Sequence, residues 1–187
     1  MTNLPNILTS IRILLVPILV VVLLTKFDGK EFVGLGLFLF AALTDFLDGY
    51  FARRWNLVSR FGQLLDPAAD KILTAAAFVS LVELNPHVTP SWMVVAILAR
   101  EFAVGALRSY AASERVIVPA GWSGKVKTGA QIVAISFLII YNKLGEFSHL
   151  APISLWVALL ITLFSGVEYF VRYWKLLTGA GTPPAAT

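Results

Sequence analysis

Four aspartates lie in the stretch that joins two strongly apolar segments, Asp45-Phe-Leu-Asp48-Gly49-Tyr-Phe-Ala52-Arg53-Arg-Trp-Asn-Leu-Val-Ser-Arg-Phe-Gly62-Gln-Leu-Leu-Asp66-Pro-Ala-Ala-Asp70. A carboxylate beside hydrocarbon is unfavourable unless it has a partner, so four of them in one short stretch require an explanation. Bound divalent metal is the simplest one. It predicts an enzyme that acts on a phosphate-bearing substrate.

The composition around this stretch is that of a membrane protein. Of the 187 residues, 58% are apolar and 14% are charged, and the mean hydropathy is +0.79. Soluble domains are about half apolar and about a quarter charged. A chain of this length has room for about five to seven spanning helices. The absence of cysteine excludes disulfides and thiol chemistry.

Six apolar segments predict an all-α integral membrane protein with six transmembrane helices. They are Ile7–Leu24, Phe32–Thr44, Ile72–Leu84, Trp92–Leu107, Val126–Tyr141 and Ile153–Tyr173. The second and third are long enough only if their helices continue into the aspartate stretch. One would then run to about Arg53 and the other would begin near Gly62 or Asp66. Pro67 would occupy the first turn of that third helix, where its missing N–H costs nothing.

The two ends of the chain differ from this pattern. An apolar stripe of Leu4, Ile7, Leu8 and Ile11 predicts a short amphipathic helix on the inner leaflet, before the first spanning helix. In a plainer interpretation, Arg12 snorkels to the membrane surface and an asparagine or threonine caps the helix. We expect one domain over residues 1–178. The Gly/Pro/Ala-rich residues 179–187 are expected to form a disordered tail.

Basic residues concentrate in alternate loops and at the C-terminal end. They are Arg53, Arg54 and Arg60, then Arg115, Lys125 and Lys127, and finally Arg172 and Lys175. Because cytoplasmic loops carry the excess of lysine and arginine, we expect both termini in the cytoplasm. Both aspartate pairs would then lie at cytoplasmic helix ends, in the same leaflet as Arg100, Glu101 and Arg108.

The aspartates share helical faces with small residues. Asp45, Asp48, Gly49 and Ala52 are spaced i, i+3, i+4, i+7, while Gly62, Asp66 and Asp70 are spaced i, i+4, i+8. Two neighbouring helices would bring the four carboxylates together, and oxygen ligands suit Mg²⁺. Glycine and alanine would let a ligand approach the backbone closely, and Arg53 could pair with a phosphate.

Each aspartate alone also has a plainer interpretation. Asp45 and Asp48 could cap a helix end or pair with Arg53 and Arg54, and Asp70 could pair with Lys71. Membrane-edge charges often snorkel or pair in this way. Four aspartates on matching faces with small residues favour a shared site.

The pattern Asp-x2-Asp-Gly-x2-Ala-Arg-x8-Gly-x3-Asp-x3-Asp resembles the signature of the CDP-alcohol phosphotransferases, and every fixed position matches. The resemblance implies a homodimer that holds two divalent cations, Mg²⁺ or Mn²⁺. A hydroxyl of an alcohol would attack a phosphorus of a CDP-linked substrate and expel CMP. The implied metal ligands are Asp45, Asp48, Asp66 and Asp70, and Asp70 is also the implied general base. The implied CDP-binding positions are Gly49, Ala52, Arg53 and Gly62, with Asn6 and Thr9 from the N-terminal region.

Four further stretches resemble the phosphatidylglycerolphosphate synthase branch of that family. They begin at Asn3, Leu65, Arg100 and Gly124. This resemblance implies CDP-diacylglycerol as donor, glycerol 3-phosphate as acceptor and a bacterial cytoplasmic (inner) membrane, with the site facing the cytoplasm. Nucleic acid is not an expected partner. The candidates for binding the acceptor phosphate are Arg100, Arg108, Lys125 and Lys127. Alternatively, the lysines contact anionic lipid headgroups, and Arg100 pairs with a carboxylate in the cavity.

Two other functions compete with this one. A synthase of the same family could use inositol phosphate, serine or phosphatidylglycerol as its acceptor. A divalent-cation transporter would instead need carboxylates near the bilayer midplane, whereas these aspartates lie at helix ends. Glu168 has no role in either scheme, and its spacing predicts an i, i+4 pair with Arg172.

Overall fold

The computed structural model describes residues 4–55, 60–113 and 121–177, and within these ranges the side chains outside 4–9, 45–55, 60–68, 70 and 175–177. All regular structure in these ranges is helical, as the sequence predicts. The long helices are α1 (Leu4–Leu24), α2 (Lys30–Trp55), α3 (Arg60–Leu84), α4 (Ser91–Ser113), α5 (Trp122–Ile139) and α6 (Leu150–Leu177). Two short 3₁₀ helices, η1 (Tyr141–Lys143) and η2 (Gly145–His149), connect α5 to α6.

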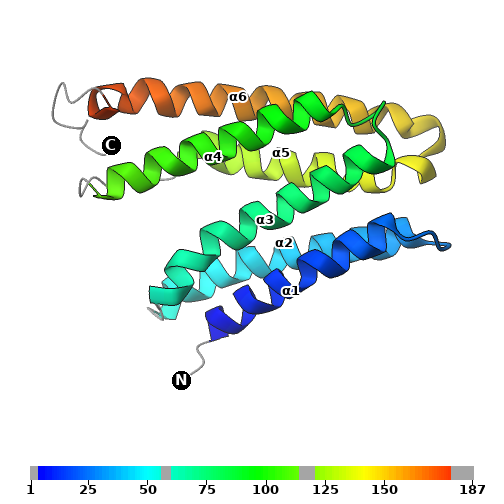
Figure 1. Cartoon of the computed structure of the whole chain (residues 1–187), viewed down its shortest axis with the longest axis horizontal. Helices are drawn as coiled ribbons and strands as arrows, with labels where there is room; N and C mark the ends of the chain where they lie inside the picture. Colours follow the sequence, from blue (N-terminus) through cyan, green and yellow to red (C-terminus); the bar gives the residue numbers. More distant parts are fainter. Residues whose placement is uncertain (1–3, 56–59, 114–120, 178–187) are drawn as a thin grey trace.

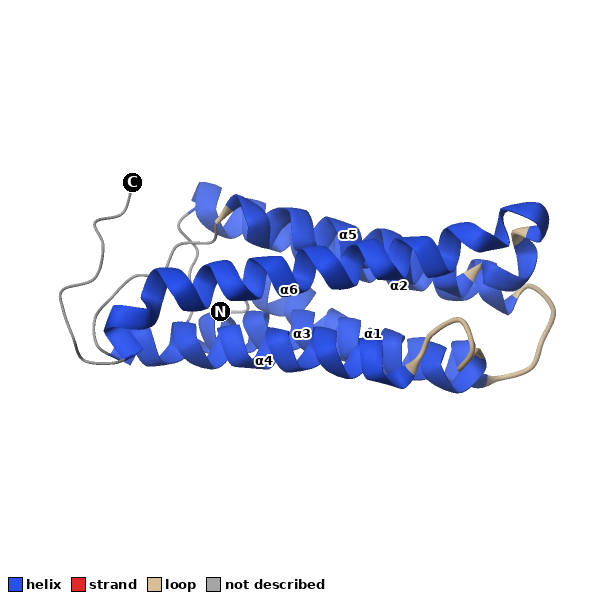
Figure 2. Ribbon diagram, turned by 90° about the horizontal axis from the view of Figure 1, so that it is seen from above, coloured by secondary structure: helices blue, strands red, loops and turns tan. Residues whose placement is uncertain are grey.

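The long helices form an elongated bundle in which successive helices run in opposite directions (Figure 1). α1 packs against α2 and α3, while α6 packs against α4 and α5. Contacts of α2 and α3 with α5, and of α3 with α4, join the two groups. Viewed from above, the helices run along one common direction, with the connections at the two ends (Figure 2). Both ends of the described chain lie at the same end of the bundle.

Two glycines of the connections at the opposite end have positive φ. Gly29 has φ +81° between α1 and α2, and Gly145 has φ +53° at the start of η2. Side chains with a Cβ rarely adopt this backbone conformation, so glycine suits both turns. We call this end, with residues 25–29, 85–90 and 140–149, the turn end. The end that holds Trp55, Arg60, Ser113 and Trp122 is the aspartate end.

The apolar core lies toward the turn end and draws on all six long helices. It includes Leu19, Phe38, Phe78, Ile97, Ile135 and Leu155. Buried polar side chains lie closer to the aspartate end, among them Arg12, Arg100, Glu101, Lys127, Gln131 and Ser165. A smaller apolar cluster of Val104, Leu107, Ala111, Tyr169 and Tyr173 also lies toward the aspartate end. The buried polar side chains therefore lie between two apolar clusters.

The structure confirms the predicted extension of two helices into the aspartate stretch, since α2 continues to Trp55 and α3 begins at Arg60. The predicted place of Pro67 is wrong, because it lies about two turns inside α3. An interior proline lacks one backbone hydrogen bond and costs about 3 kcal/mol in an isolated helix. Packing against α1, rather than local propensity, therefore maintains this part of α3.

The separate amphipathic helix predicted at the N-terminus is also wrong, because residues 4–24 form one helix. Pro5 stands in its first turn, where proline is tolerated, and neither proline nor glycine follows before Pro17. Nothing therefore ends the helix between the two predicted pieces. The predicted tail, residues 179–187, lies outside the described residues.

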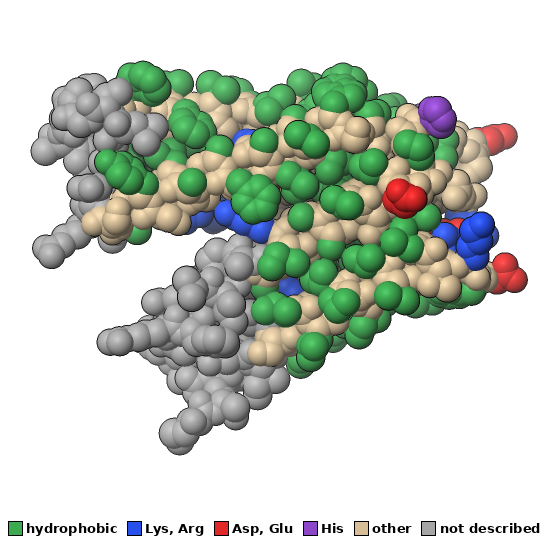
Figure 3. Space-filling view, viewed as in Figure 1, with side chains coloured by type: hydrophobic (Ala, Val, Ile, Leu, Met, Phe, Trp, Pro, Cys, Tyr) green, Lys and Arg blue, Asp and Glu red, His purple; other side chains and the backbone are tan. Residues whose placement is uncertain are grey.

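Large apolar side chains cover the outside of the bundle (Figure 3). Leu14, Phe32 and Phe164 expose 66%, 62% and 71% of their surface. Among the described residues, one helical stretch, Gly145–Trp174, is long and apolar enough to cross a membrane. Other long helices carry charged residues in their middle, such as Arg100 and Glu101 in α4.

Candidate active site

The four aspartates lie on two helices that meet at the aspartate end. Asp45 and Asp48 are in the last three turns of α2, and Asp66 and Asp70 are in the first three turns of α3. The two helix ends lie close together (Figure 1), and the helices contact each other. The aspartate side chains are outside the described set, within which no group of three His, Cys, Asp or Glu could hold a metal. Metal binding by the four aspartates therefore stays a prediction.

Beside this region, a buried ionic cluster ties α4, α5 and α6 together around Glu101. Its Oε1 atom lies 3.3 Å from Arg100 Nη1, and it accepts hydrogen bonds from Lys127 Nζ and Gln131 Nε2. All four side chains are buried. We call these four residues, with Thr162 and Ser165, the Glu101 cluster. A buried carboxylate surrounded by donors in this way ties together the helices that carry its partners.

α6 completes the cluster with small polar side chains. Arg100 Nη2 donates to Ser165 Oγ at 2.6 Å, and Gln131 Nε2 donates to Thr162 Oγ1 at 3.2 Å. The Arg100 side chain also lies close to the backbone of α6, where a Cβ on Gly166 would come within 2.8 Å of Arg100 Cγ. Glycine at position 166 therefore makes room for the buried arginine.

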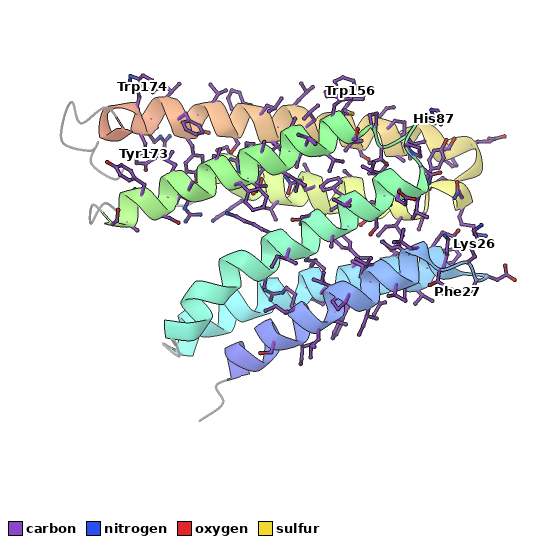
Figure 4. The ribbon with its side chains drawn as sticks, in the orientation of Figure 1. Lys26, Phe27, His87, Trp156, Tyr173 and Trp174 are labelled. Carbon is purple, nitrogen blue, oxygen red and sulfur yellow. The ribbon has the colours of Figure 1, made fainter. Side chains whose placement is uncertain are left out.

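Tyr169 connects this cluster to the start of α5. Its ring lies 5.8 Å from the Arg100 guanidinium carbon, within range of a cation–π interaction. Its hydroxyl oxygen accepts the Gly121 N–H at 2.8 Å. Tyr173 stacks on Tyr169 and lies in the space between α4 and α6, while Trp174 points away from it (Figure 4). Tyr169 thus holds the helix start from which Lys125 and Lys127 extend.

The four cations predicted to bind the acceptor phosphate fall into a buried pair and an exposed pair. Arg100 and Lys127 are buried and paired with Glu101. Arg108 and Lys125 are exposed. The predicted alternative for Arg100, a pair with a cavity carboxylate, is what the structure shows. Figure 3 shows a hollow between α3 and α4 toward the aspartate end, with lysine and arginine atoms along its wall.

Two other charged residues of the sequence analysis are also placed. Arg12 is fully buried on the face of α1 that carries Val16 and Leu19, so the predicted snorkelling is wrong. The apolar positions of α1 carry Arg12 into the interface with α2 and α3. The predicted pair of Glu168 and Arg172 is confirmed, at 3.1 Å on the surface of α6.

The sequence analysis missed the contribution of α6. Thr162, Ser165 and Tyr169 are spaced i, i+3, i+7, which places polar groups on one face of an otherwise apolar helix. Lys127 and Gln131, at i and i+4, show the same signal on α5. A search for polar residues with helical spacing would have found both faces.

Comparison with known proteins agrees with this arrangement of helices. Residues 2–164 match the family model described as CDP-alcohol phosphatidyltransferase. A protein of Bacillus subtilis is 44% identical over 192 residues, covering 95% of this chain and 98% of the relative. Relatives in Rickettsia typhi and Salmonella typhimurium are 38% and 40% identical, covering 91% and 89% of this chain and 96% and 92% of their own lengths. All three are named CDP-diacylglycerol–glycerol-3-phosphate 3-phosphatidyltransferase.

Proposed function

This chain belongs to the CDP-alcohol phosphatidyltransferase family, and on that premise we propose that it transfers the phosphatidyl group of CDP-diacylglycerol to sn-glycerol 3-phosphate. The observation that carries the proposal is the identity of 37–44% to relatives of that name along most of the chain. The aspartate stretch lies inside the matched region. The products would be phosphatidylglycerol phosphate and CMP.

In the proposed reaction, a hydroxyl oxygen of glycerol 3-phosphate forms a bond to the phosphorus that carries diacylglycerol. The bond from that phosphorus to an oxygen of CMP breaks, and the hydroxyl proton passes to Asp70. Asp70 lies on α3, three turns from its start. Gly49, Ala52, Arg53 and Gly62 would bind the CDP group, with Asn6 and Thr9 from α1.

The donor set fits two divalent cations, Mg²⁺ or Mn²⁺. It consists of carboxylate oxygens alone, and the spacing of the four aspartates predicts one face of each of two contacting helices. Such oxygen ligands suit hard cations. Asp45, Asp48 and Asp66 would hold the metals together with Asp70. Two divalent cations held by these aspartates would neutralise the negative charge that develops on the leaving CMP.

We further propose that the six long helices cross a bacterial cytoplasmic membrane, with both termini and the site on the cytoplasmic side. The apolar exterior supports the membrane crossing, because exposing large apolar side chains such as Leu14 and Phe164 to water is unfavourable. The basic residues near the aspartate end support the orientation. We also propose a homodimer and two bound metals, as the resemblance of the aspartate stretch to the family signature implies.

The test is release of CMP from CDP-diacylglycerol by the purified protein in detergent micelles with Mg²⁺. With glycerol 3-phosphate present, we expect the rate of CMP release to be well above the rate without an acceptor. Inositol phosphate, serine and phosphatidylglycerol serve as competing acceptors. The proposal is wrong if one of these supports CMP release while glycerol 3-phosphate does not.

A further inference from the structure

Lys71, for which the proposed mechanism has no role, crosses from α3 to the surface of α4. Its ammonium nitrogen occupies the space that a Cβ atom on residue 105 would need, and its Cε lies 3.5 Å from that position. Lys71 can therefore make this contact only because residue 105 is a glycine. Any other residue at position 105 would force the end of the Lys71 side chain to move.

Gly105 lies on α4 between two charged residues of the site. Glu101, Gly105 and Arg108 are spaced i, i+4, i+7, so they follow one face of the helix. Residues with this spacing are neighbours, with Cβ atoms about 5–6 Å apart. The Lys71 ammonium thus lies between the buried Glu101 cluster and the exposed Arg108.

The charges along this face do not balance within the described part of the chain. Glu101 already pairs with Arg100 and Lys127. Neither Lys71 nor Arg108 makes an ion pair with another described residue, and Lys71 is half-buried. Two cations without a described ion-pair partner on neighbouring positions would be favourable ligands for an anion that binds between them. A phosphomonoester dianion has the charge and the oxygens to do so.

We propose that Lys71, held against α4 by the gap at Gly105, binds the phosphate group of the acceptor together with Arg108. This inference rests on the proposed function and deepens it by naming a further residue that selects a phosphorylated alcohol. Lys71 directly follows Asp70 on α3, so this contact starts from the same helical turn as the residue proposed to take the hydroxyl proton.

The position of the contact favours the acceptor over the donor, whose pyrophosphate is also an anion. The CDP-binding positions implied by the sequence lie on α1, on α2 and in the first turn of α3, and none is on α4. Lys71 instead reaches α4, the helix that carries Arg108. If the acceptor phosphate binds at α4, the CDP group can bind on the side of the site that α2 forms.

The experiment compares Gly105→Ala and Lys71→Met with the unchanged protein in steady-state CMP release. Both variants remove the ammonium from its place on α4. Each should raise the KM for glycerol 3-phosphate about tenfold or more, as expected for losing a hydrogen bond between charged groups. The KM for CDP-diacylglycerol should stay within about twofold of the original. The double variant should be no worse than Lys71→Met alone, because both changes act on one contact.

Gly129→Ala is the matched control. Gly129 lies on the exposed side of α5, and a Cβ there meets no atom within 4 Å, so its KM values should not change. Gly105→Ala displaces only the flexible end of a lysine, and alanine favours a helix over glycine. Its thermal midpoint should therefore be no lower than that of the original protein, which separates lost binding from lost folding.

Three results would overturn the inference: unchanged KM for glycerol 3-phosphate in both variants, a rise confined to the KM for CDP-diacylglycerol, or additive effects in the double variant. A failure of the proposed function looks different. In that case the unchanged protein itself would release no CMP with glycerol 3-phosphate.

Discussion

A single carboxylate oxygen joins the buried charges of α4 and α5. Glu101 Oε1 accepts hydrogen bonds from Arg100 of its own helix and from Lys127 and Gln131 of α5. It is a counter-charge for both buried cations. This makes Glu101 a positioning residue for the side chains around the proposed acceptor site.

Replacing Glu101 with glutamine should therefore be costly. It removes the negative charge that Arg100 and Lys127 share, and breaking a buried pair typically costs about 3–5 kcal/mol of folding stability. Thermal unfolding in detergent measures the effect. Glu168→Gln is the matched control, because its pair with Arg172 is exposed and is worth at most about 0.5 kcal/mol. Equal losses in the two variants would show that the Glu101 cluster does not stabilise the bundle.

Asp70 and Asp48 should differ in what their loss removes. Asp70→Asn keeps an oxygen ligand but cannot take a proton, so turnover should fall about a hundredfold or more while Mn²⁺ still binds. Asp48→Ala should weaken Mn²⁺ binding itself. Electron paramagnetic resonance of Mn²⁺ measures binding, and CMP release measures turnover. Full activity of Asp70→Asn would exclude Asp70 as the base.

At the scale of elements, α6 acts as a support for α4 and α5. Its polar face supplies Thr162, Ser165 and Tyr169 to the Glu101 cluster and to the start of α5. Ser165 and Tyr169 lie beyond the region that matches the family model. The first turn of α5 depends on Tyr169, since the Gly121 N–H donates to its hydroxyl.

Tyr169→Phe removes that hydroxyl and keeps the ring over Arg100. Loss of one neutral hydrogen bond costs about 1 kcal/mol, so the KM for glycerol 3-phosphate should rise about fivefold as the start of α5 loosens. Amide hydrogen exchange at residues 121–124 should become faster. Tyr173→Phe is the control, because the Tyr173 hydroxyl has no hydrogen bond to another described residue. Unchanged exchange in Tyr169→Phe would contradict this role.

The helices were largely predictable, whereas the pairing of the cations was not. The length that a spanning helix needs predicted the continuation of α2 and α3 through the aspartates. Helical spacing shows which side of a helix a residue occupies but not which neighbour it meets. The choice of Glu101 as partner for Arg100 and Lys127 depends on how α4, α5 and α6 pack. For the same reason, the contact of Lys71 with α4 could not be predicted, because it depends on Gly105 of another helix.

At the scale of the whole molecule, the main apolar core lies toward the turn end, and the Glu101 cluster with a smaller apolar cluster lies toward the aspartate end. The long helices alternate in direction, so the links at either end should face opposite sides of the membrane (Figure 1). The proposed orientation places the turn end outside and the aspartate end in the cytoplasm.

Single cysteines test this orientation cleanly, because the chain has none of its own. Asp28→Cys and His87→Cys lie at the turn end and should react with a membrane-impermeant maleimide added to intact cells. Ser113→Cys lies at the aspartate end and should react only after the membrane is opened. Labelling of Ser113→Cys in intact cells, with no labelling of the other two, would reverse the proposed orientation.

The most direct test of the central claim is the ratio of CMP released to labelled glycerol 3-phosphate that enters the lipid fraction. The assay uses the purified protein with CDP-diacylglycerol and Mg²⁺. Phosphatidyl transfer predicts one labelled glycerol phosphate in lipid for each CMP, and neither product when the divalent cation is chelated. Release of CMP without label in the lipid would contradict transfer to glycerol 3-phosphate.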